Sequence, residues 1–250
     1  MIVAIHTVMR DTYEPYLFEW LNYHHSIGVD RFFLYDNESK IPLTESIKSI
    51  PFKDNIFVSY IPGVPSLKFD VQRGSYLYFL GTIRDKSFPK IDRVAFIDED
   101  EFIICKNNDI KAILSNYLEY PGLAINWRMF GSSGLLEQTP ILQMEKFVWY
   151  APNYQGNVNI KSIVNPYLIE SVTSPHTFTY TQGFCVDTDK KPIEGFYIMS
   201  PIYKEMWINH YWTRSLAEWN EKVLRGQANT GQKRESSMFD ELNILCTEHV

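Results

Sequence analysis

Residues 94–102 read Val94-Ala95-Phe96-Ile97-Asp98-Glu99-Asp100-Glu101-Phe102, in which four apolar residues are followed directly by four carboxylates. A short apolar run bounded by polar residues is typical of a strand that is buried on both faces of a mainly parallel sheet. Ligands of open α/β sheets bind beyond the carboxyl ends of the strands. The acidic segment 98–101 is therefore the leading candidate for a binding site.

The chain before this stretch alternates β-rich apolar runs with helical patterns, which is typical of βα units. The expected strands are 2–8, 31–35, 56–60 and 94–97, and the expected helices are 17–27, 43–50 and 69–83. Asp11 or Thr12 is a candidate cap for the first helix, and Gly28 suits its end. Asp36 follows the second strand, so it is expected at the same sheet edge as Asp98. We expect an α/β fold with a Rossmann-like, mainly parallel sheet flanked by helices.

The second half of the chain has weaker periodic signals. Residues 110–118 form a helical stripe, and strands are expected at 122–127 and 160–164, within an irregular, β-containing C-terminal half. Ser215 and Glu218 form a capping box for a helix that Gly226 closes. We expect one domain over residues 1–226, followed by a polar and partly mobile extension over 227–250.

Composition limits the possible function classes. The chain has 250 residues, 45% of them hydrophobic, and a formal net charge of -6, so no nucleic-acid partner is expected. Cys105, Cys185 and Cys246 are odd in number and lack metal-site spacing, which indicates a reducing cytoplasm. The N-terminus shows no basic leader, and no apolar stretch reaches membrane-spanning length, which leaves peripheral contact at the inner face of the membrane as an alternative.

The acidic segment has the chemistry of a metal site. In an extended backbone, Asp98 and Asp100 point to one side, which suits Mn²⁺ or Mg²⁺ bridging a diphosphate. Four adjacent carboxylates repel each other, and a bound cation relieves that repulsion. The competing interpretation is a solvated acidic turn.

The segment 97–102 resembles the D-x-D-E-F signature of family 2 type glycosyltransferases and their family 92 relatives. Further pieces of that group's pattern follow the same order along the chain. They are Glu19-Trp20 with Tyr23-His24, Gly28-Val29-Asp30, Tyr35-Asp36-Asn37-Glu38-Ser39, Asn126-Trp127, Phe130-Gly131-Ser132-Ser133-Gly134, Lys161-Ser162-Ile163-Val164, Asn209-His210-Tyr211, Ser215, Lys222 and Arg225-Gly226. The resemblance spans about residues 2 to 226 and implies a GT-A fold.

The resemblance also implies roles for individual residues. Asp98 and Asp100 would approach the metal and the donor's ribose and diphosphate, with Glu99 between them, while Asp36, with Asn37 beside it, would meet the nucleotide base. UDP-sugars would be the usual donors. His176 and His210 are both candidates to complete the metal site, because GT-A enzymes often provide a late histidine.

For other residues the sequence allows either a ligand contact or a structural role. Relatives commonly show an asparagine-glutamate pair where this chain has Arg10 and Asp11, and Arg10 is a candidate phosphate ligand or a surface salt bridge. Lys161, Arg214 and Lys222 are candidates to hold diphosphate charge.

The catalytic base has no clear sequence signal. Glu137 is the first candidate, and Asp187 and Glu194 are alternatives. The loop 131–134 is a candidate for close approach to a ligand or a plain turn. Trp127 and Phe130 suit stacking on a sugar or packing in the core.

These observations favour a metal-dependent glycosyltransferase that moves a sugar from a UDP-sugar to a glycan or lipid-linked acceptor with inversion. The alternative is a non-catalytic nucleotide-sugar-binding protein of the same fold. Metal-dependent nucleotidyl transfer is disfavoured, because the N-terminal region has no glycine-rich nucleotide loop.

Overall fold

The computed structural model describes residues 1–66, 70–85, 89–227 and 230–250. Its main feature is a nine-stranded sheet in the order β3-β2-β1-β4-β8-β6-β12-β5, with β11 paired to β6. The strands are β1 (Val3–Met9), β2 (Arg31–Asp36), β3 (Ile56–Tyr60), β4 (Arg93–Phe96), β5 (Glu101–Cys105), β6 (Gly122–Met129), β8 (Ile160–Val164), β11 (Cys185–Val186) and β12 (Met206–His210). Five neighbouring pairs are parallel, whereas β8 is antiparallel to both β4 and β6 and β5 is antiparallel to β12.

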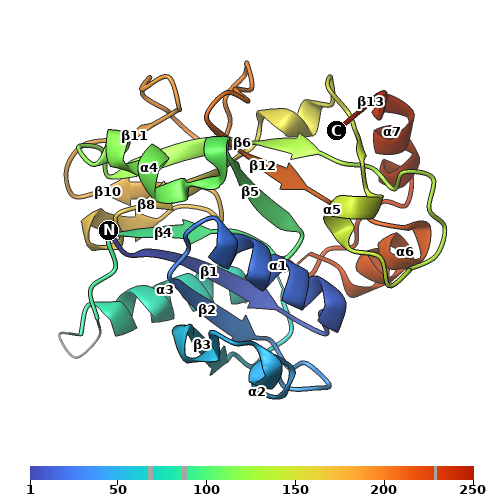
Figure 1. Cartoon of the computed structure of the whole chain (residues 1–250), viewed down its shortest axis with the longest axis horizontal. Helices are drawn as coiled ribbons and strands as arrows, with labels where there is room; N and C mark the ends of the chain where they lie inside the picture. The colour runs from blue at the N-terminus through green and yellow to red at the C-terminus, as the bar shows by residue number, and fades with distance from the viewer. Residues whose placement is uncertain (67–69, 86–88, 228–229) are drawn as a thin grey trace.

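Helices cover both faces of the sheet. Helices α1 (Glu14–Ser26) and α4 (Ile110–Leu114) contribute Trp20 and Ile110 to a core on one face, and α3 (Val71–Ile83) contributes Phe79 to a core on the other. Figure 1 shows α1 and α4 on the viewer's side, with α5 (Gln143–Lys146), α6 (Leu216–Arg225) and α7 (Met238–Leu245) gathered at one end. The helix α2 (Leu43–Ser46) follows β2.

The predicted fold class is confirmed. Strands β3-β2-β1-β4 form the mainly parallel, Rossmann-like part that the βα alternation predicted. Later strands from the irregular half join the same sheet between β4 and β5. The expected bounds of 56–60 and 160–164 match β3 and β8, whereas the first helix is capped at Tyr13, with Pro15 in its first turn, rather than at Asp11 or Thr12. The predicted start of the third helix at 69 lies outside the described residues.

The acidic segment differs from the expected extended backbone. Residues Glu99 and Asp100 form a turn between β4 and β5, in which the N–H of Glu101 donates to the carbonyl of Asp98 at 3.1 Å. The alternation argument for Asp98 and Asp100 is therefore wrong, although both side chains still reach one site, as shown below.

The C-terminal stretch after α6 contains a further helix and a short strand. The capping box of Ser215 and Glu218 and the closing Gly226, with φ +83, are confirmed. Helix α7 was not predicted, and its Phe239 and Leu242 are buried. Beyond it, β13 (Glu248–His249) pairs with β7 (Trp149–Tyr150), and a separate hairpin joins β9 (Ile169–Val172) to β10 (Phe178–Tyr180).

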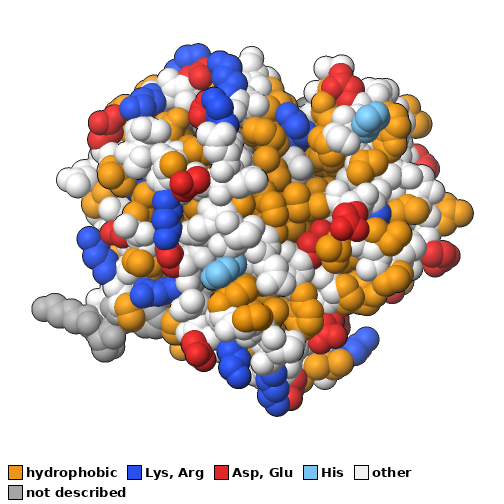
Figure 2. Space-filling view, in the orientation of Figure 1, with side chains coloured by type: hydrophobic (Ala, Val, Ile, Leu, Met, Phe, Trp, Pro, Cys, Tyr) orange, Lys and Arg blue, Asp and Glu red, His pale blue; other side chains and the backbone are white. Residues whose placement is uncertain are grey.

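The surface and helix lengths give two further observations. Figure 2 shows Lys and Arg side chains spread among Asp and Glu side chains over the visible face. Among the described residues, no helix combines the length and the apolar character that crossing a membrane requires.

Candidate functional site

A cavity of about 480 Å³ opens at the predicted edge of the sheet. It is lined by residues that follow or end four strands: Arg10 after β1, Asn37 after β2, Asp98 after β4 and His210 in β12. Because β8 runs in the opposite direction, it contributes Lys161 from its beginning. The cavity also reaches α6 and the segment after it. Its volume lies within the range of about 300–1,000 Å³ that is typical of small-molecule sites.

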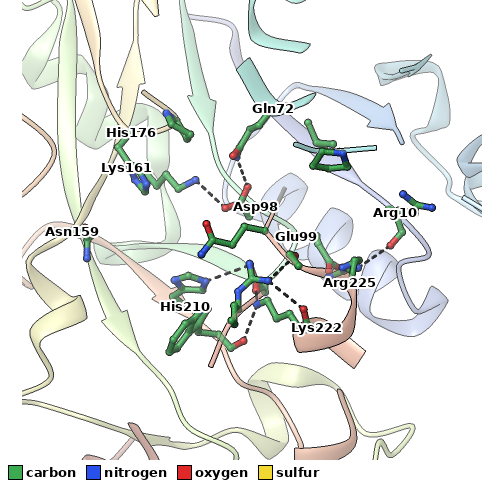
Figure 3. A pocket seen from close by; sticks show the side chains of 18 of the residues that line it. Arg10, Gln72, Asp98, Glu99, Asn159, Lys161, His176, His210, Lys222 and Arg225 are labelled. Carbon is green, nitrogen blue, oxygen red and sulfur yellow. Dashed lines mark hydrogen bonds and ion pairs between the residues drawn. The ribbon is translucent and has the colours of Figure 1, made fainter. Parts of the chain in front are cut away.

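Asp98 lies at the centre of the cavity wall, and protein donors occupy both of its carboxylate oxygens. Gln72 Nε2 donates to Oδ1 at 2.9 Å, and Lys161 Nζ donates to Oδ2 at 3.0 Å; Figure 3 shows both side chains directed at Asp98. Burial raises the pKa of Asp98, but the Lys161 ammonium outweighs it and holds the pKa below its ordinary value. Asp98 is therefore an anion with a fixed counter-charge.

Asp100 forms a second carboxylate–lysine pair. Lys222 Nζ in α6 donates to Oδ2 of Asp100 at 2.5 Å, and His210 Nε2 lies 3.4 Å from Oδ1. Burial raises the pKa of Asp100, but Lys222 and then His210 outweigh it and hold the pKa well below its ordinary value. Lys222 also donates to the carbonyl of Trp212 at 2.8 Å, which fixes the ammonium in place.

The two glutamates of the segment have different environments. Glu99 lines the cavity and is held by Arg214, whose Nη2 lies 3.3 Å from Oε2. Glu101 is fully buried, and its Oε2 accepts the backbone N–H of Asp98 at 3.0 Å. Burial raises the pKa of Glu101 well above its ordinary value, although Lys161 at 3.6 Å opposes this. Glu101 therefore shapes the turn and does not face a ligand.

Helix α1 positions the acidic turn through the motif at 19–24. Strand β5 pairs with β12 on one side only, so its other edge needs hydrogen-bond partners. Trp20 Nε1 donates to the carbonyl of Glu101 at 2.8 Å, and Tyr23 Oη donates to the carbonyl of Ile103 at 3.0 Å. His24 Nε2 accepts the N–H of Ile103 at 3.1 Å. These residues, which the resemblance picked out, fix the backbone that carries Asp98 and Asp100.

The cations of the cavity explain how four carboxylates coexist. Lys161, Lys222 and Arg214 each pair with the acidic segment, so the repulsion that suggested a metal is relieved by the protein itself. The residues that line the cavity include three carboxylates, Asp98, Glu99 and Asp100, and five cations. The cations are Arg10, Lys161, Lys222, Arg225 and Arg234. The lining is thus formally two charges more cationic than anionic, which suits an anionic ligand.

The predicted metal does not fit this arrangement. Asp98, Asp100 and His210 have suitable ligand types for Mn²⁺ or Mg²⁺, but ammonium groups occupy one oxygen of each carboxylate. In residues 1–66, 70–85, 89–227 and 230–250, no three His, Cys, Asp or Glu side chains are grouped to hold a metal ion. The lysine pairs leave one oxygen of each carboxylate without an ammonium partner, and metal dependence stays a prediction.

The two candidate histidines lie on the wall with Lys161. His210 packs against Trp127, with ring centroids 4.5 Å apart, and burial lowers its pKa although Asp100 opposes this. His176 Nδ1 lies 2.8 Å from the carbonyl oxygen of Ile160. Burial, reinforced by Lys161, lowers the pKa of His176 to about 4. Both imidazoles are therefore neutral near pH 7.

The cavity also has an aromatic side. Trp127, Tyr154 and Trp212 line it, each partly exposed, together with Met129. Trp212 is supported from behind by Trp219, at a centroid distance of 5.0 Å. Flat, partly exposed rings of this kind can stack on a sugar or a base.

The two residues predicted to meet the base, Asp36 and Asn37, are placed differently in the structure. Asp36 does not line the cavity, because its Oδ1 and Oδ2 accept the N–H groups of Ser39 and Leu43, both at 2.9 Å, and so hold the turn after β2. Asn37 does line the cavity, with its amide nitrogen donating to the carbonyls of Ile61 and Gly63. Of these two residues, Asn37 is the one that faces the cavity.

Arg214 and the glycine loop also lie outside the cavity lining. Arg214 stands over the Tyr16 ring at 4.8 Å and holds Glu99. In the loop 131–134, the N–H and hydroxyl of Ser132 donate to Asn243 of α7, at 2.7 and 2.8 Å. The loop therefore binds α7, and Phe130 beside it is fully buried in the core.

None of the predicted base candidates lies in the cavity lining. Glu137 and Glu194 are exposed, and Asp187 is buried, with its Oδ1 accepting the N–H groups of Asp189 and Lys191. We therefore do not carry these three residues into the site. The sequence analysis did not identify Gln72 and Asn159 as lining residues of the cavity. Gln72 is a polar residue in the first turn of α3 and Asn159 is a polar residue just before β8, and neither pattern is specific for a binding site.

Comparisons with known proteins agree with the family 92 part of the resemblance. No family model matches the chain. The chain is 26% identical to a glycosyltransferase family 92 protein of Arabidopsis thaliana over 184 residues, which cover 68% of this chain and 30% of that protein. It is 28% identical to a glycosyltransferase family 92 protein of Ricinus communis over 214 residues, which cover 82% of this chain and 36% of that protein. The chain thus spans about a third of the length of these relatives.

Solved structures give a weaker likeness. The crystal structure of S. aureus TarS 1-349 is 16% identical, covers 67% of this chain and 48% of that chain, and has a TM-score of 0.41. The crystal structure of HddC from Yersinia pseudotuberculosis is 12% identical, covers 88% of this chain and 97% of that chain, and has a TM-score of 0.43. At such scores the likeness carries no conclusion about function.

Proposed function

We propose that the protein is a glycosyltransferase that moves a sugar from a nucleoside-diphosphate sugar to an acceptor hydroxyl, with the 480 Å³ cavity as its donor site. The observation that carries the proposal is the excess of cationic side chains in a cavity that also has an aromatic wall and lies at the carboxyl edge of the sheet. The similarity to proteins named glycosyltransferase family 92 supports the reaction class.

The donor diphosphate would bind on the cationic side of the cavity. Arg10 and Arg225 lie together there, where Arg225 Nη1 donates to the carbonyl of Arg10 at 3.2 Å. Lys222 comes from the same helix as Arg225. Arginine matches phosphate oxygens with two parallel donors, and lysine supplies a compact charge. Cations fixed in this way stabilise the negative charge that develops on the departing diphosphate.

The nucleoside and the sugar would occupy the neutral parts of the lining. Asn37 after β2 offers a polar edge and Val64 after β3 offers an apolar surface, which suit a base. Trp127 lies beside His210 on the opposite wall and suits the sugar. UDP is the donor nucleotide that we propose on the family resemblance.

The reaction is a displacement at the anomeric carbon. The acceptor oxygen forms a bond to that carbon while the bond to the phosphate oxygen breaks, and the nucleoside diphosphate leaves with the electron pair. We propose inversion and a glycan or lipid-linked acceptor, also on the resemblance. NMR analysis of the product anomer tests the stereochemistry, because retained configuration contradicts inversion.

Calorimetric titration with UDP tests the donor site, performed in EDTA and in Mn²⁺ with wild type, Asp98→Ala and Asp100→Ala. Binding in EDTA is the result expected if the protein cations suffice. A gain in affinity with Mn²⁺ that both variants lose would establish the predicted metal site. No UDP binding under either condition would contradict the proposed donor.

A further inference from the structure

His176 is the imidazole whose second ring nitrogen is left open to the cavity. Its Nδ1 lies 2.8 Å from the carbonyl oxygen of Ile160, an acceptor only, so Nδ1 carries the proton of the neutral ring. Nε2 then has a free lone pair. No described residue forms a hydrogen bond to Nε2, and the side chain lines the cavity. This tautomer presents a proton acceptor to whatever the cavity binds.

The backbone around His176 is fixed. The hydroxyl of Ser162 in β8 donates to the carbonyl of His176 at 2.7 Å, and the N–H of His176 donates to Ser174 Oγ at 3.1 Å. The ring packs edge-on against Trp127, at a centroid distance of 5.3 Å. An imidazole held at its backbone and at Nδ1 keeps Nε2 in one direction, as a proton-transfer group requires.

The other proton acceptors of the cavity are already engaged. Asp98 and Asp100 are paired with Lys161 and Lys222, and protonating either carboxylate would break an ion pair. Glu99 is held by an arginine outside the cavity. His210 directs Nε2 at Asp100, and its Nδ1 is buried and faces Glu101 at 3.8 Å.

His176 lies on the side of the cavity from which the acceptor hydroxyl would approach the donor sugar. In the view of Figure 3, His176 and His210 lie on one side of Asp98, and Arg10 and Arg225 lie on the other. If the diphosphate binds on the arginine side, the anomeric carbon faces the histidine side, where the attacking hydroxyl approaches opposite the leaving group. A base on that side is needed because the hydroxyl loses its proton as the new bond forms.

We propose that His176 is the general base of the reaction, a role that rests on the function proposed above. Nε2 takes the proton of the acceptor hydroxyl as its oxygen bonds to the anomeric carbon, and the nucleoside diphosphate leaves with the electrons of the broken bond. The imidazolium then returns the proton to solvent. Burial and Lys161 lower the pKa of His176, so the ring is neutral near pH 7 and its Nε2 lone pair is free.

The test compares wild type, His176→Ala, His176→Gln and the control His249→Ala, which removes an exposed imidazole. The rate of UDP release is measured with UDP-glucose, UDP-galactose and UDP-N-acetylglucosamine, with water as the acceptor. Loss of a general base lowers the rate by about 10²–10⁴-fold. We expect this loss of rate in both His176 variants. Their affinity for UDP should stay within about 3-fold of wild type, which is less than the tenfold change that about 1.4 kcal/mol of binding free energy produces. Added imidazole should restore part of the rate to His176→Ala alone.

Three outcomes contradict the proposal and can be told apart. An active wild type with an undiminished His176→Ala variant refutes the base and leaves the proposed function intact. A slow variant that has lost UDP binding and does not respond to imidazole shows a structural role for His176. An inactive wild type refutes the proposed function itself, and the base with it.

Discussion

His24 gives a stability prediction whose sign depends on pH. Its Nδ1 donates to the carbonyl of Trp20 at 2.8 Å, and its Nε2 accepts the N–H of Ile103 at 3.1 Å, so the neutral ring satisfies both partners. A protonated ring would direct a second N–H at the N–H of Ile103. Burial lowers the pKa of His24 from 6.5 to about 3. The ring is therefore neutral in the folded state and titrates normally when unfolded.

The sign of the effect follows from proton binding. Between pH 6.5 and pH 3 the unfolded state binds a proton that the folded state does not, so stability is full above pH 6.5 and falls as the pH decreases through this window. For these two pKa values the loss at pH 5 is about 2 kcal/mol. Replacement of His24 by Phe removes this term. It also leaves the buried N–H of Ile103 without an acceptor, which costs about 1–3 kcal/mol.

Urea unfolding of wild type and His24→Phe at pH 7.5 and pH 5 measures both terms, with His249→Phe as the control. We expect the variant to be less stable by about 2 kcal/mol at pH 7.5 and to match wild type within about 1 kcal/mol at pH 5, since only wild type has the protonation penalty. His6 and the other buried groups are common to both proteins and cancel. An equal difference at the two pH values would refute the reasoning.

Two further variants probe the site. Lys222→Met removes an ammonium that lines the cavity, so calorimetry should show a UDP affinity that is lower by about 10-fold or more, the equivalent of at least one charge-assisted hydrogen bond. The control Lys53→Met, at an exposed lysine, should bind UDP as wild type does. If Lys222→Met binds UDP as tightly as wild type, Lys222 is not part of the donor site. Trp20→Phe leaves the carbonyl of Glu101 without its side-chain donor, so urea unfolding should show a free energy of unfolding that is lower by about 1–3 kcal/mol. An unchanged free energy of unfolding would mean that α1 does not fix the acidic turn.

Local patterns in the sequence predicted the parts of the fold that depend on local chemistry. Strand β8 was bounded correctly by its apolar run, and the cap of α6 by Ser215 and Glu218, because both signals act within a few residues. Helix α7 was missed because its two buried residues give only a short apolar pattern, and its stability comes from packing against Trp219 and from Asn243 binding the loop at 131–134.

The site could be located from the sequence but its pairings could not. Asp98 follows a buried strand, and strand ends share one edge of a parallel sheet, so its position was predictable. Its partner Lys161 lies 63 residues away on an antiparallel strand, and the sequence does not specify that register. The sequence does not show that Lys161 and Lys222 pair with Asp98 and Asp100, so four adjacent carboxylates with no visible counter-charge led to the prediction of a metal ion. Glu137 follows the glycine loop at 131–134, and that loop binds α7 rather than lining the cavity.

The release of UDP from UDP-sugars by the wild-type protein tests the central claim most directly. We measure it with and without Mn²⁺, in the presence of simple sugar acceptors, and with Lys222→Met as the matched variant with one cavity cation removed. The account predicts steady UDP release that Lys222→Met reduces. If the protein binds UDP but releases no UDP from any of the UDP-sugars, with or without Mn²⁺, it is not a glycosyltransferase. That result would favour a non-catalytic nucleotide-sugar-binding protein.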